Sequence, residues 1–179
     1  MAHREQEDFC LKVKSDYPEY FENKRVLDVG SLDINGSNRG LFTNCEYIGI
    51  DLGEGKNVDV ICPAHEYCEP DDSFDTIVST ETFEHDKFLL KTLDNIMRLL
   101  KPCGLFFFTC ATNGRPEHGT SRTIPADSPF TLDFYRPVSA DLIKSSLDLS
   151  KFKTFRLSIE KHRHDLRFVG VKDGQKQAT

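Results

Sequence analysis

Arg25–Gly30 reads RVLDVG and Tyr47–Asp51 reads YIGID, and these two short apolar segments set the architecture of the chain. Both are shorter than an ordinary helix, apolar almost throughout, and end on an acid or a glycine. Continuous apolar strands of this kind are buried on both faces, as in a parallel sheet covered by helices. Similar segments predict further strands over 58–62, 74–80 and 104–111.

Helical patterns precede and separate these strands. Residues 5–16 carry an apolar side and stop before Pro18, which cannot continue a helix. The strongest helix is predicted over 86–100, and a shorter one over 139–147 has Ser139 as its N-cap. The apolar stripe of the strongest helix consists of Leu89, Leu93, Ile96, Met97 and Leu100.

The C-terminal third predicts a hairpin and a long loop. Strands over 154–160 and 166–171 are joined by a short polar linker and are expected to pair antiparallel. Residues 112–138 show no periodicity but contain aromatic residues and prolines, so we expect an ordered active-site loop. We therefore expect one α/β domain over residues 1–172, beginning with a helical segment over 1–24 and followed by a loose tail over 173–179.

Composition limits the class of protein. The 179 residues are 38% hydrophobic and 29% charged, which is typical of a globular domain. No apolar run reaches the length of a membrane span, and the polar start MAHREQEDF lacks the apolar core of a secretory signal. Six cysteines without a CxxC pair predict reduced thiols and a cytoplasmic location, and we expect no metal site.

Charge is unevenly distributed along the chain. The net charge is −6, but residues 1–86 carry −13 and residues 87–179 carry +7. This excludes a uniformly basic nucleic-acid binder and leaves nucleic acid as a partner that is not favoured. The basic side chains of the loop and hairpin either attract an anionic acceptor or are ordinary surface charges; they are Arg115, Arg122, Arg136, Lys161, Arg163 and Arg167.

Polar residues follow successive strands at the edge where an open parallel sheet binds its ligands. Asp51 ends the second strand, and an acid there can accept hydrogen bonds from both hydroxyls of a ribose. Gly30 ends the first strand and permits close approach of a ligand to the backbone. The candidate binding residues are Asp28, Gly30, Ser31, Asp51, Leu52, Ala64, His65, Thr80 and Glu81.

Four motifs in order make the chain resemble a class I methyltransferase that uses S-adenosylmethionine, of the small type 11 kind. They are VLDVG at 26–30, YIGIDL at 47–52, FDTIVSTETFEH at 74–85 and RLLKPCGLFFFT at 98–109. The resemblance covers about residues 25–111 and, more loosely, the final hairpin. It implies a Rossmann-like fold with a mostly parallel seven-stranded sheet and an antiparallel last strand.

The resemblance also implies residue roles. It places the methionine part of the cofactor at Asp28, Gly30 and Ser31, with Thr80 and Glu81 on the same side. It places the ribose at Asp51 and Leu52, and the adenine beside Ala64 and His65. S-adenosylhomocysteine would be the product left by the cofactor.

The sequence departs from this family pattern in the first loop. Leu32 and Ile34 stand where the family has glycines, and Gly36 follows as a substitute for close approach. Little chain remains for helices after the first and second strands, so we expect these to be reduced. The altered loop keeps open an alternative, a methyltransferase-like fold retained as a non-catalytic binding module. A nicotinamide-dependent oxidoreductase is disfavoured, because its GxGxxG turn is absent.

Methyl transfer from a sulfonium requires alignment and exclusion of water more than it requires covalent catalysis. A general base is needed only for a poor nucleophile such as a hydroxyl group. His118 in the long loop and His85 before the long helix are the candidate catalytic residues. The acceptor is expected to be a small molecule or a glycan, and nothing in the sequence indicates an oligomeric state.

Overall fold

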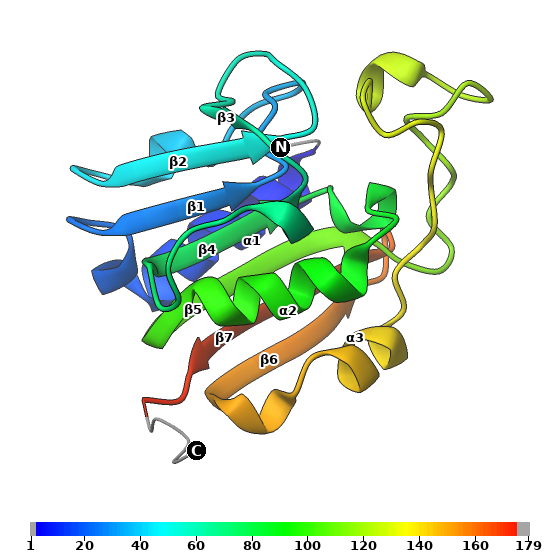
Figure 1. The fold of residues 1–179 in the computed structure, drawn as a ribbon. Coiled ribbons are helices and arrows are strands. Elements are labelled where there is room, and N and C mark those ends of the chain that lie inside the picture. The colour runs from blue at the N-terminus through cyan, green and yellow to red at the C-terminus, as the bar shows by residue number, and fades with distance from the viewer. Residues whose placement is uncertain (1–2, 175–179) are drawn as a thin grey trace.

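A single sheet of seven strands runs through the computed structural model, which describes residues 3–174 (Figure 1). The strands are β1 (Arg25–Val29), β2 (Glu46–Asp51), β3 (Val60–Ile61), β4 (Phe74–Thr80), β5 (Leu100–Ala111), β6 (Phe152–Glu160) and β7 (Asp165–Lys172). Their spatial order is β3-β2-β1-β4-β5-β7-β6. All neighbours pair parallel except β7, which is inserted antiparallel between β5 and β6. The predicted Rossmann-like sheet with an antiparallel last strand is confirmed.

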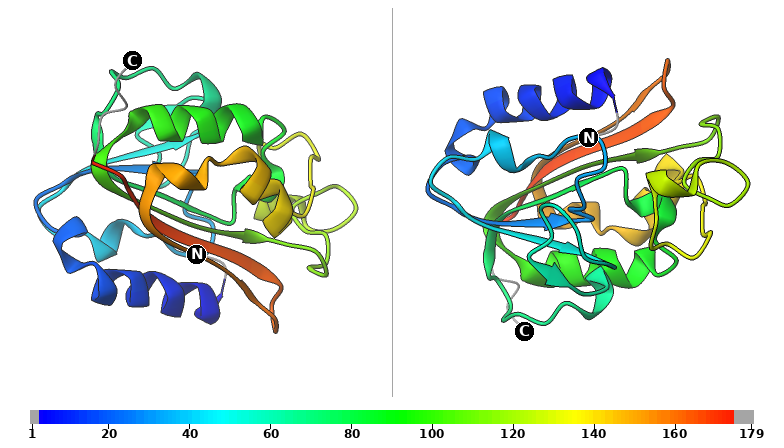
Figure 2. Two further views of the ribbon diagram at one scale, coloured as in Figure 1. Left: turned by 90° about the horizontal axis from the view of Figure 1, so that it is seen from below. Right: turned by 90° about the horizontal axis from the view of Figure 1, so that it is seen from above.

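Helices cover the sheet on both faces. Helix α1 (Arg4–Asp16) lies on one face, and α2 (Leu89–Leu99) and α3 (Ala140–Ser146) lie on the other (Figure 2). Within residues 3–174, the only helical elements between β1 and β4 are the short 3-10 turns η2 (Arg39–Leu41) and η3 (Ala64–Glu66). This confirms the expected reduction of helices after the first two strands. Four other 3-10 turns are η1 (Pro18–Tyr20), η4 (Phe83–His85), η5 (Pro125–Asp127) and η6 (Leu149–Lys151).

The core consists of two apolar layers separated by the sheet. Successive side chains of β5 point to opposite faces, so Phe106 packs in the layer with α2 while Phe107 packs in the layer with α1. Each layer also contains a fully buried thiol, Cys110 in the first and Cys10 in the second. The continuous apolar run of β5 therefore serves both faces, as its sequence predicts.

Helix α2 begins three residues later than the sequence predicts. Residues 83–85 form the 3-10 turn η4, and the side chain of Asp86 then accepts the backbone N–H of Phe88 at 2.7 Å. At the other end α2 stops at Leu99, and β5 begins directly, four residues before its predicted start. Cys103, at a φ of 60°, lies inside the resulting irregular pairing between β4 and β5.

The third strand is shorter and more exposed than predicted. Only Val60–Ile61 pair with β2, and Ile61 is 59% exposed. This corrects the expectation of a strand over 58–62 buried on both faces. Among residues 3–174 the segment between β2 and β3 forms no helix that could cover the strand.

The C-terminal hairpin and α3 match the sequence closely. Glu160 pairs opposite Asp165, so the linker between them closes the predicted antiparallel hairpin. Ser139 caps α3 by accepting the backbone N–H of Leu142. Of the predicted tail, 175–179 lie outside the described residues, whereas Asp173 donates its backbone N–H to the Lys151 carbonyl at 2.7 Å and so remains attached. No helix among residues 3–174 has both the length and the apolar character needed to cross a bilayer.

Candidate active site

A cavity of about 760 Å³ opens at the carboxyl ends of β1, β2 and β4, within the volume range of small-molecule sites. One wall comes from the strand ends and the other from residues 127–134 of the long loop. Seven of the nine predicted binding residues line it: Gly30, Asp51, Leu52, Ala64, His65, Thr80 and Glu81. The parallel sheet brings these residues together because its strands end at one edge.

Asp51 is held at the cavity wall by backbone donors. Its carboxylate accepts the N–H of Leu32 at 3.0 Å and the N–H of Leu52 at 2.7 Å, one on each oxygen. Partial burial raises the pKa of Asp51 above its ordinary value. The backbone N–H of Gly53 also hydrogen-bonds to this carboxylate, so three backbone donors use three of its roughly four acceptor positions. The side chain can therefore accept a further hydrogen bond from a ligand.

Asp28 and Ser31, the other two predicted binding residues, lie outside the cavity lining, and their contact with a ligand stays a prediction. Because strand side chains alternate, Asp28 points to the α1 face, where the Tyr47 hydroxyl donates to it at 2.6 Å. Burial raises the pKa of Asp28 to about 6. Ser31 is buried beneath the loop, against Gly49.

Gly30 does line the cavity, but its lack of a side chain makes room for Thr82. It has a φ of 78°, and a Cβ added there would lie 1.9 Å from Oγ1 of Thr82. The close approach predicted for Gly30 is thus made to the turn after β4. In the altered first loop, Leu32, Ile34 and Asn35 line the cavity, whereas Gly36 does not. The side chains of Leu32 and Ile34 therefore form part of the wall at positions where the family has glycines.

The β3 side of the cavity is fixed to helix α2. Asn95 of α2 donates to the carbonyl oxygens of Ala64 at 2.8 Å and Tyr67 at 3.0 Å, which holds η3 in place. The His65 ring packs on Phe88 with centroids 4.4 Å apart. Together these two rings form an aromatic patch beside the cavity, of which only His65 was predicted from the sequence.

The long loop crosses the cavity from β5 toward β2. The Phe130 ring lies on the backbone of Gly53, where an added Cβ would meet its atoms at 2.5 Å. A larger residue at Gly53 would push the loop away. Residues 127–134 of the long loop thus face the ends of the strands across the cavity (Figure 1), and the active-site role of the 112–138 segment stays a prediction.

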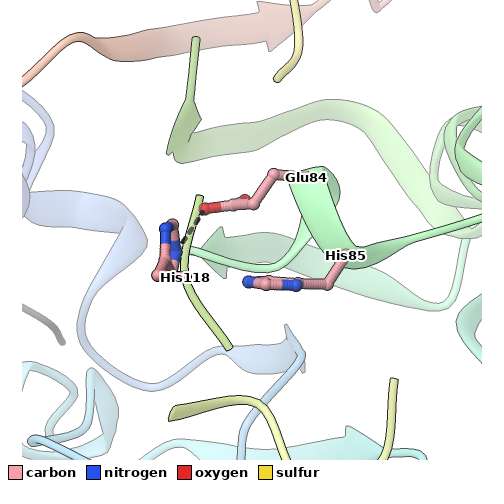
Figure 3. Close-up of side chains that lie close together, drawn as sticks. All are labelled: Glu84, His85 and His118. Carbon is pink, nitrogen blue, oxygen red and sulfur yellow. Dashed lines mark ion pairs between the residues drawn. The ribbon is translucent and has the colours of Figure 1, made fainter. Parts of the chain in front are cut away.

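The loop also brings His118 to His85, the two candidate catalytic residues. Their ring centroids are 5.0 Å apart, and both rings pack on Tyr135. His118 Nε2 lies 3.6 Å from Oε1 of Glu84, which is fully buried (Figure 3). The ion pair with Glu84 raises the pKa of His118 against the opposing effect of burial, whereas burial lowers the pKa of His85. Of the two histidines, only His85 lines the cavity. Glu84 was not among the site residues predicted from the sequence.

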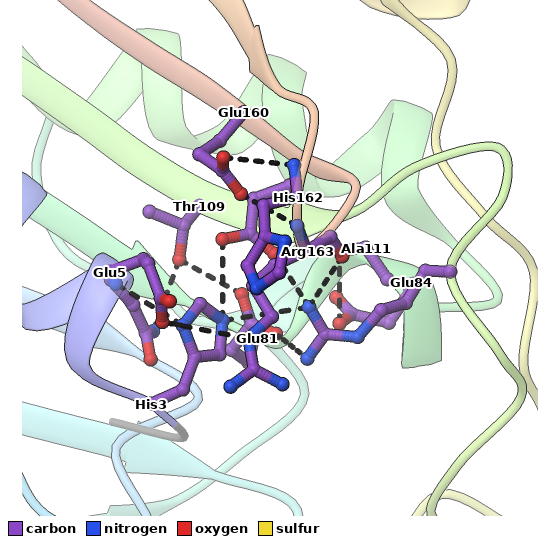
Figure 4. Close-up of polar contacts among 12 residues, drawn as sticks. His3, Glu5, Glu81, Glu84, Thr109, Ala111, Glu160, His162 and Arg163 are labelled. Atoms are coloured by element: carbon purple, nitrogen blue, oxygen red, sulfur yellow. Dashed lines mark hydrogen bonds and ion pairs between the residues drawn. The ribbon is translucent and has the colours of Figure 1, made fainter.

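Glu81 belongs to a second polar group, beside the first. Its carboxylate accepts the Thr109 hydroxyl at 3.1 Å and lies 3.3 Å from the Arg115 guanidinium. Arg115 also contacts the buried Asp165 at 2.6 Å, and His3 approaches Asp165 at 3.3 Å. Figure 4 shows this network joining the N-terminal helix, the end of β4 and the final hairpin. Burial raises the pKa of Glu81 to about 7.

The cavity is acidic. Its charged lining residues are Asp51, Glu81, Asp86, Asp127, Asp133 and Lys87. A cleft lined mainly by one sign of charge concentrates ligands of the opposite sign. This cavity therefore favours a cationic ligand over an anionic one.

Several loop and hairpin arginines are already paired within the chain. Arg115 contacts two carboxylates, and Arg122 pairs with Glu117. Arg167 contacts Asp165 and donates to the Glu5 carbonyl at 2.9 Å. Of the two interpretations of this basic cluster, the structure supports ordinary structural and surface charges at these three positions.

A family model for a methyltransferase domain matches residues 1–140, and no curated protein sequence matches the chain. Solved structures with the same fold include phosphoethanolamine N-methyltransferase 2 of Haemonchus contortus with S-adenosyl-L-methionine, at TM-score 0.67 and 16% identity. That match covers 93% of this chain and 52% of the other, so this chain spans about half the length of that relative.

Two other similar structures are close to this chain in length. A SAM-dependent methyltransferase of Archaeoglobus fulgidus has TM-score 0.64 and 17% identity, with 93% of this chain and 94% of that chain covered. The 1,6-didemethyltoxoflavin-N1-methyltransferase of Burkholderia thailandensis, solved with bound 1,6-didemethyltoxoflavin and S-adenosylhomocysteine, has TM-score 0.60 and 14% identity, over 97% and 92% of the two chains. The chain belongs to the methyltransferase-domain family and has the class I fold of the S-adenosylmethionine-dependent methyltransferases.

Proposed function

We propose that this methyltransferase binds S-adenosylmethionine in the cavity at the strand ends and methylates a hydroxyl group of a small molecule or glycan. The observation that carries the proposal is the position of Asp51, at the wall of an open 760 Å³ cavity with acceptor capacity to spare. A ribose beside it would donate a hydroxyl to this carboxylate in a charge-assisted hydrogen bond.

The lining residues fit the cofactor. Asp51 and Leu52 would hold the ribose, and the adenine would lie beside Ala64 and His65 near the aromatic patch. Gly30, Thr80 and Glu81 would flank the methionine part. The acidic lining suits the positive sulfur, and bound cofactor would supply a methyl group already activated by that charge.

The chain's own contribution is placement and shielding. The loop at 127–134 covers the cavity and limits the access of water to it. His85 and His118 lie at the end next to η4, where the acceptor would enter. As the candidate catalytic residues, they would orient the acceptor hydroxyl and favour loss of its proton.

The charge of the site disfavours an anionic acceptor. The acidic lining and the internally paired arginines give an anionic polymer little to bind. Nucleic acid therefore remains the less favoured partner. Six free cysteines are consistent with the proposed cytoplasmic location.

The test is titration calorimetry of the full chain with S-adenosylmethionine and S-adenosylhomocysteine, together with thermal unfolding. We expect one site per chain and a melting temperature that rises with ligand concentration, because ligand binds only the native state. His118→Ala should leave the affinity for both ligands unchanged, since His118 lies outside the cavity lining. Absence of binding by either ligand would contradict the proposed function.

A further inference from the structure

The ring nitrogens of His85 and His118 and the carboxylate of Glu84 converge on one small space (Figure 3). One ligand atom from each lies within 4.8 Å of the other two. Bonds of about 2.0–2.1 Å in a tetrahedral site place ligand atoms about 3.3 Å apart. The observed 3.6 Å between His118 Nε2 and Glu84 Oε1 is close to that spacing, and modest side-chain rotation would bring in the third atom.

Backbone carbonyls orient both histidines. Nδ1 of His85 lies 3.1 Å from the Phe134 carbonyl, and Nδ1 of His118 lies 3.2 Å from the Pro116 carbonyl. A carbonyl can only accept, so each Nδ1 carries its proton and donates. In a neutral ring Nε2 is then the unprotonated atom, ready to bind an ion. Metal-binding histidines are commonly held in this way by a partner on the other nitrogen.

Glu84 has a buried oxygen that needs a partner. Oε1 accepts the backbone N–H of Ala111 at 3.1 Å, but Oε2 has no hydrogen-bond partner, although the residue is 0% exposed. A buried carboxylate oxygen without a donor is costly. A cation bound beside the two rings would balance the charge of this buried carboxylate.

The loop backbone is built to fit closely against this group. Gly119 has a φ of 69°, and a Cβ there would lie 2.9 Å from Cε1 of His85 and 2.5 Å from Cβ of Ser128. Only glycine lets the chain place His118 beside His85. His85 also lines the cavity, so a bound ion would have a face open toward it.

We propose that Glu84, His85 and His118 form a binding site for one divalent transition-metal ion, with Zn²⁺ the best match. Two imidazoles and one carboxylate suit transition metals rather than Mg²⁺ or Ca²⁺, and three protein ligands leave a coordination position free. This proposal departs from the expectation of no metal site. The role of the open position rests on the proposed function: it would bind the acceptor hydroxyl and lower the pKa of that hydroxyl.

The neighbouring group of His3, Glu81 and Asp165 also has ligand-like spacing but already contains a cation. The Arg115 guanidinium contacts both carboxylates there. It satisfies their charge and occupies the position that an ion would need. This group therefore serves as the internal comparison for the proposed site.

The experiment is calorimetric titration of the metal-stripped full chain with Zn²⁺, followed by absorption spectroscopy with Co²⁺ as a probe of coordination. We expect one ion per chain and visible Co²⁺ bands typical of nitrogen and oxygen ligands. His118→Ala should weaken binding by about a hundredfold or more, since even loss of a supporting partner costs 10–100-fold. Because Glu84 is fully buried, Glu84→Gln serves as a second variant after its fold is verified by circular dichroism.

His3→Ala and His162→Ala are the matched controls and should bind Zn²⁺ as the unaltered chain does. Absence of stoichiometric binding by the unaltered chain would overturn the proposal and leave Glu84 and His118 as a simple ion pair. Binding that survives in both His118→Ala and Glu84→Gln would also overturn it. Calorimetry with S-adenosylmethionine on the metal-stripped chain keeps the two proposals separate. The proposed cofactor binding does not depend on a metal ion, so it should persist in the stripped chain even if the metal proposal fails.

Discussion

The carboxylate of Asp51 accepts the backbone N–H of Leu32 at 3.0 Å, so the end of β2 holds the loop that follows β1. The residue proposed to bind the ribose thus also shapes the wall beside it. Removing the charge and removing the side chain should therefore have different effects.

Asp51→Asn should weaken binding of S-adenosylmethionine by about 1–3 kcal/mol, because a charge-assisted pair becomes a neutral one. Asp51→Ala should weaken it further, since the support of Leu32 is also lost. Calorimetry measures both. Glu46→Gln, at the exposed opposite end of β2, is the control and should bind as the unaltered chain does. Equal affinity in all three variants would show that the ribose is held elsewhere.

Asp28 predicts a pH dependence of stability. Burial raises its pKa in the folded chain to about 6, against about 3.9 in the unfolded chain. The folded state therefore retains a proton that the unfolded state has lost. The stabilisation is complete below about pH 4 and disappears as the pH rises through 6, a difference of about 3 kcal/mol.

Asp28→Asn should remove this dependence, because its amide oxygen can still accept the Tyr47 hydroxyl without acquiring a charge. The free energy of unfolding at pH 7.5 should equal or exceed that of the unaltered chain. Urea unfolding at intervals between pH 4 and 7.5 measures the difference between the two chains. Parallel curves would mean that Asp28 titrates normally in the folded state.

Arg115 and Arg122 provide a matched comparison of ion pairs. Arg115→Met should cost about 3 kcal/mol of unfolding free energy, because Asp165 is fully buried and loses its nearest cation. Arg122→Met should cost less than about 1 kcal/mol, since Arg122 is 60% exposed where it pairs with Glu117. Chemical denaturation of both variants tests the contrast, and similar losses would argue against a structural role for the Arg115 network.

The sheet was predictable because each inner strand is a continuous apolar run, and the order of motifs fixed its parallel topology. The ends of elements were less predictable. The helix pattern begins at Asp86 in the sequence, but the chain forms a turn over 87–88 after η4, and α2 begins only at Leu89. The exposure of β3 depends on a helix that is absent, which a strand pattern alone does not reveal.

The candidate site was partly predictable for a similar reason. Residues at strand ends, such as Asp51, converge by topology alone. The motif does not show to which face Asp28 points, and the alternation of side chains along β1 turns it toward α1. The meeting of Glu84 with His118 joins two segments through an aperiodic loop, and no local pattern encodes that contact.

The two apolar layers each contain one inaccessible thiol, Cys10 on the buried face of α1 and Cys110 of β5 in the layer with α2. Burial raises the pKa of Cys10 to about 12 and raises that of Cys110 well above its usual value, so neither is reactive in the native state. Exposed Cys68 and Cys103 remain open to alkylation. The order in which a labelling reagent modifies Cys10 and Cys110 thus reports which side of the sheet opens first, without any engineered probe.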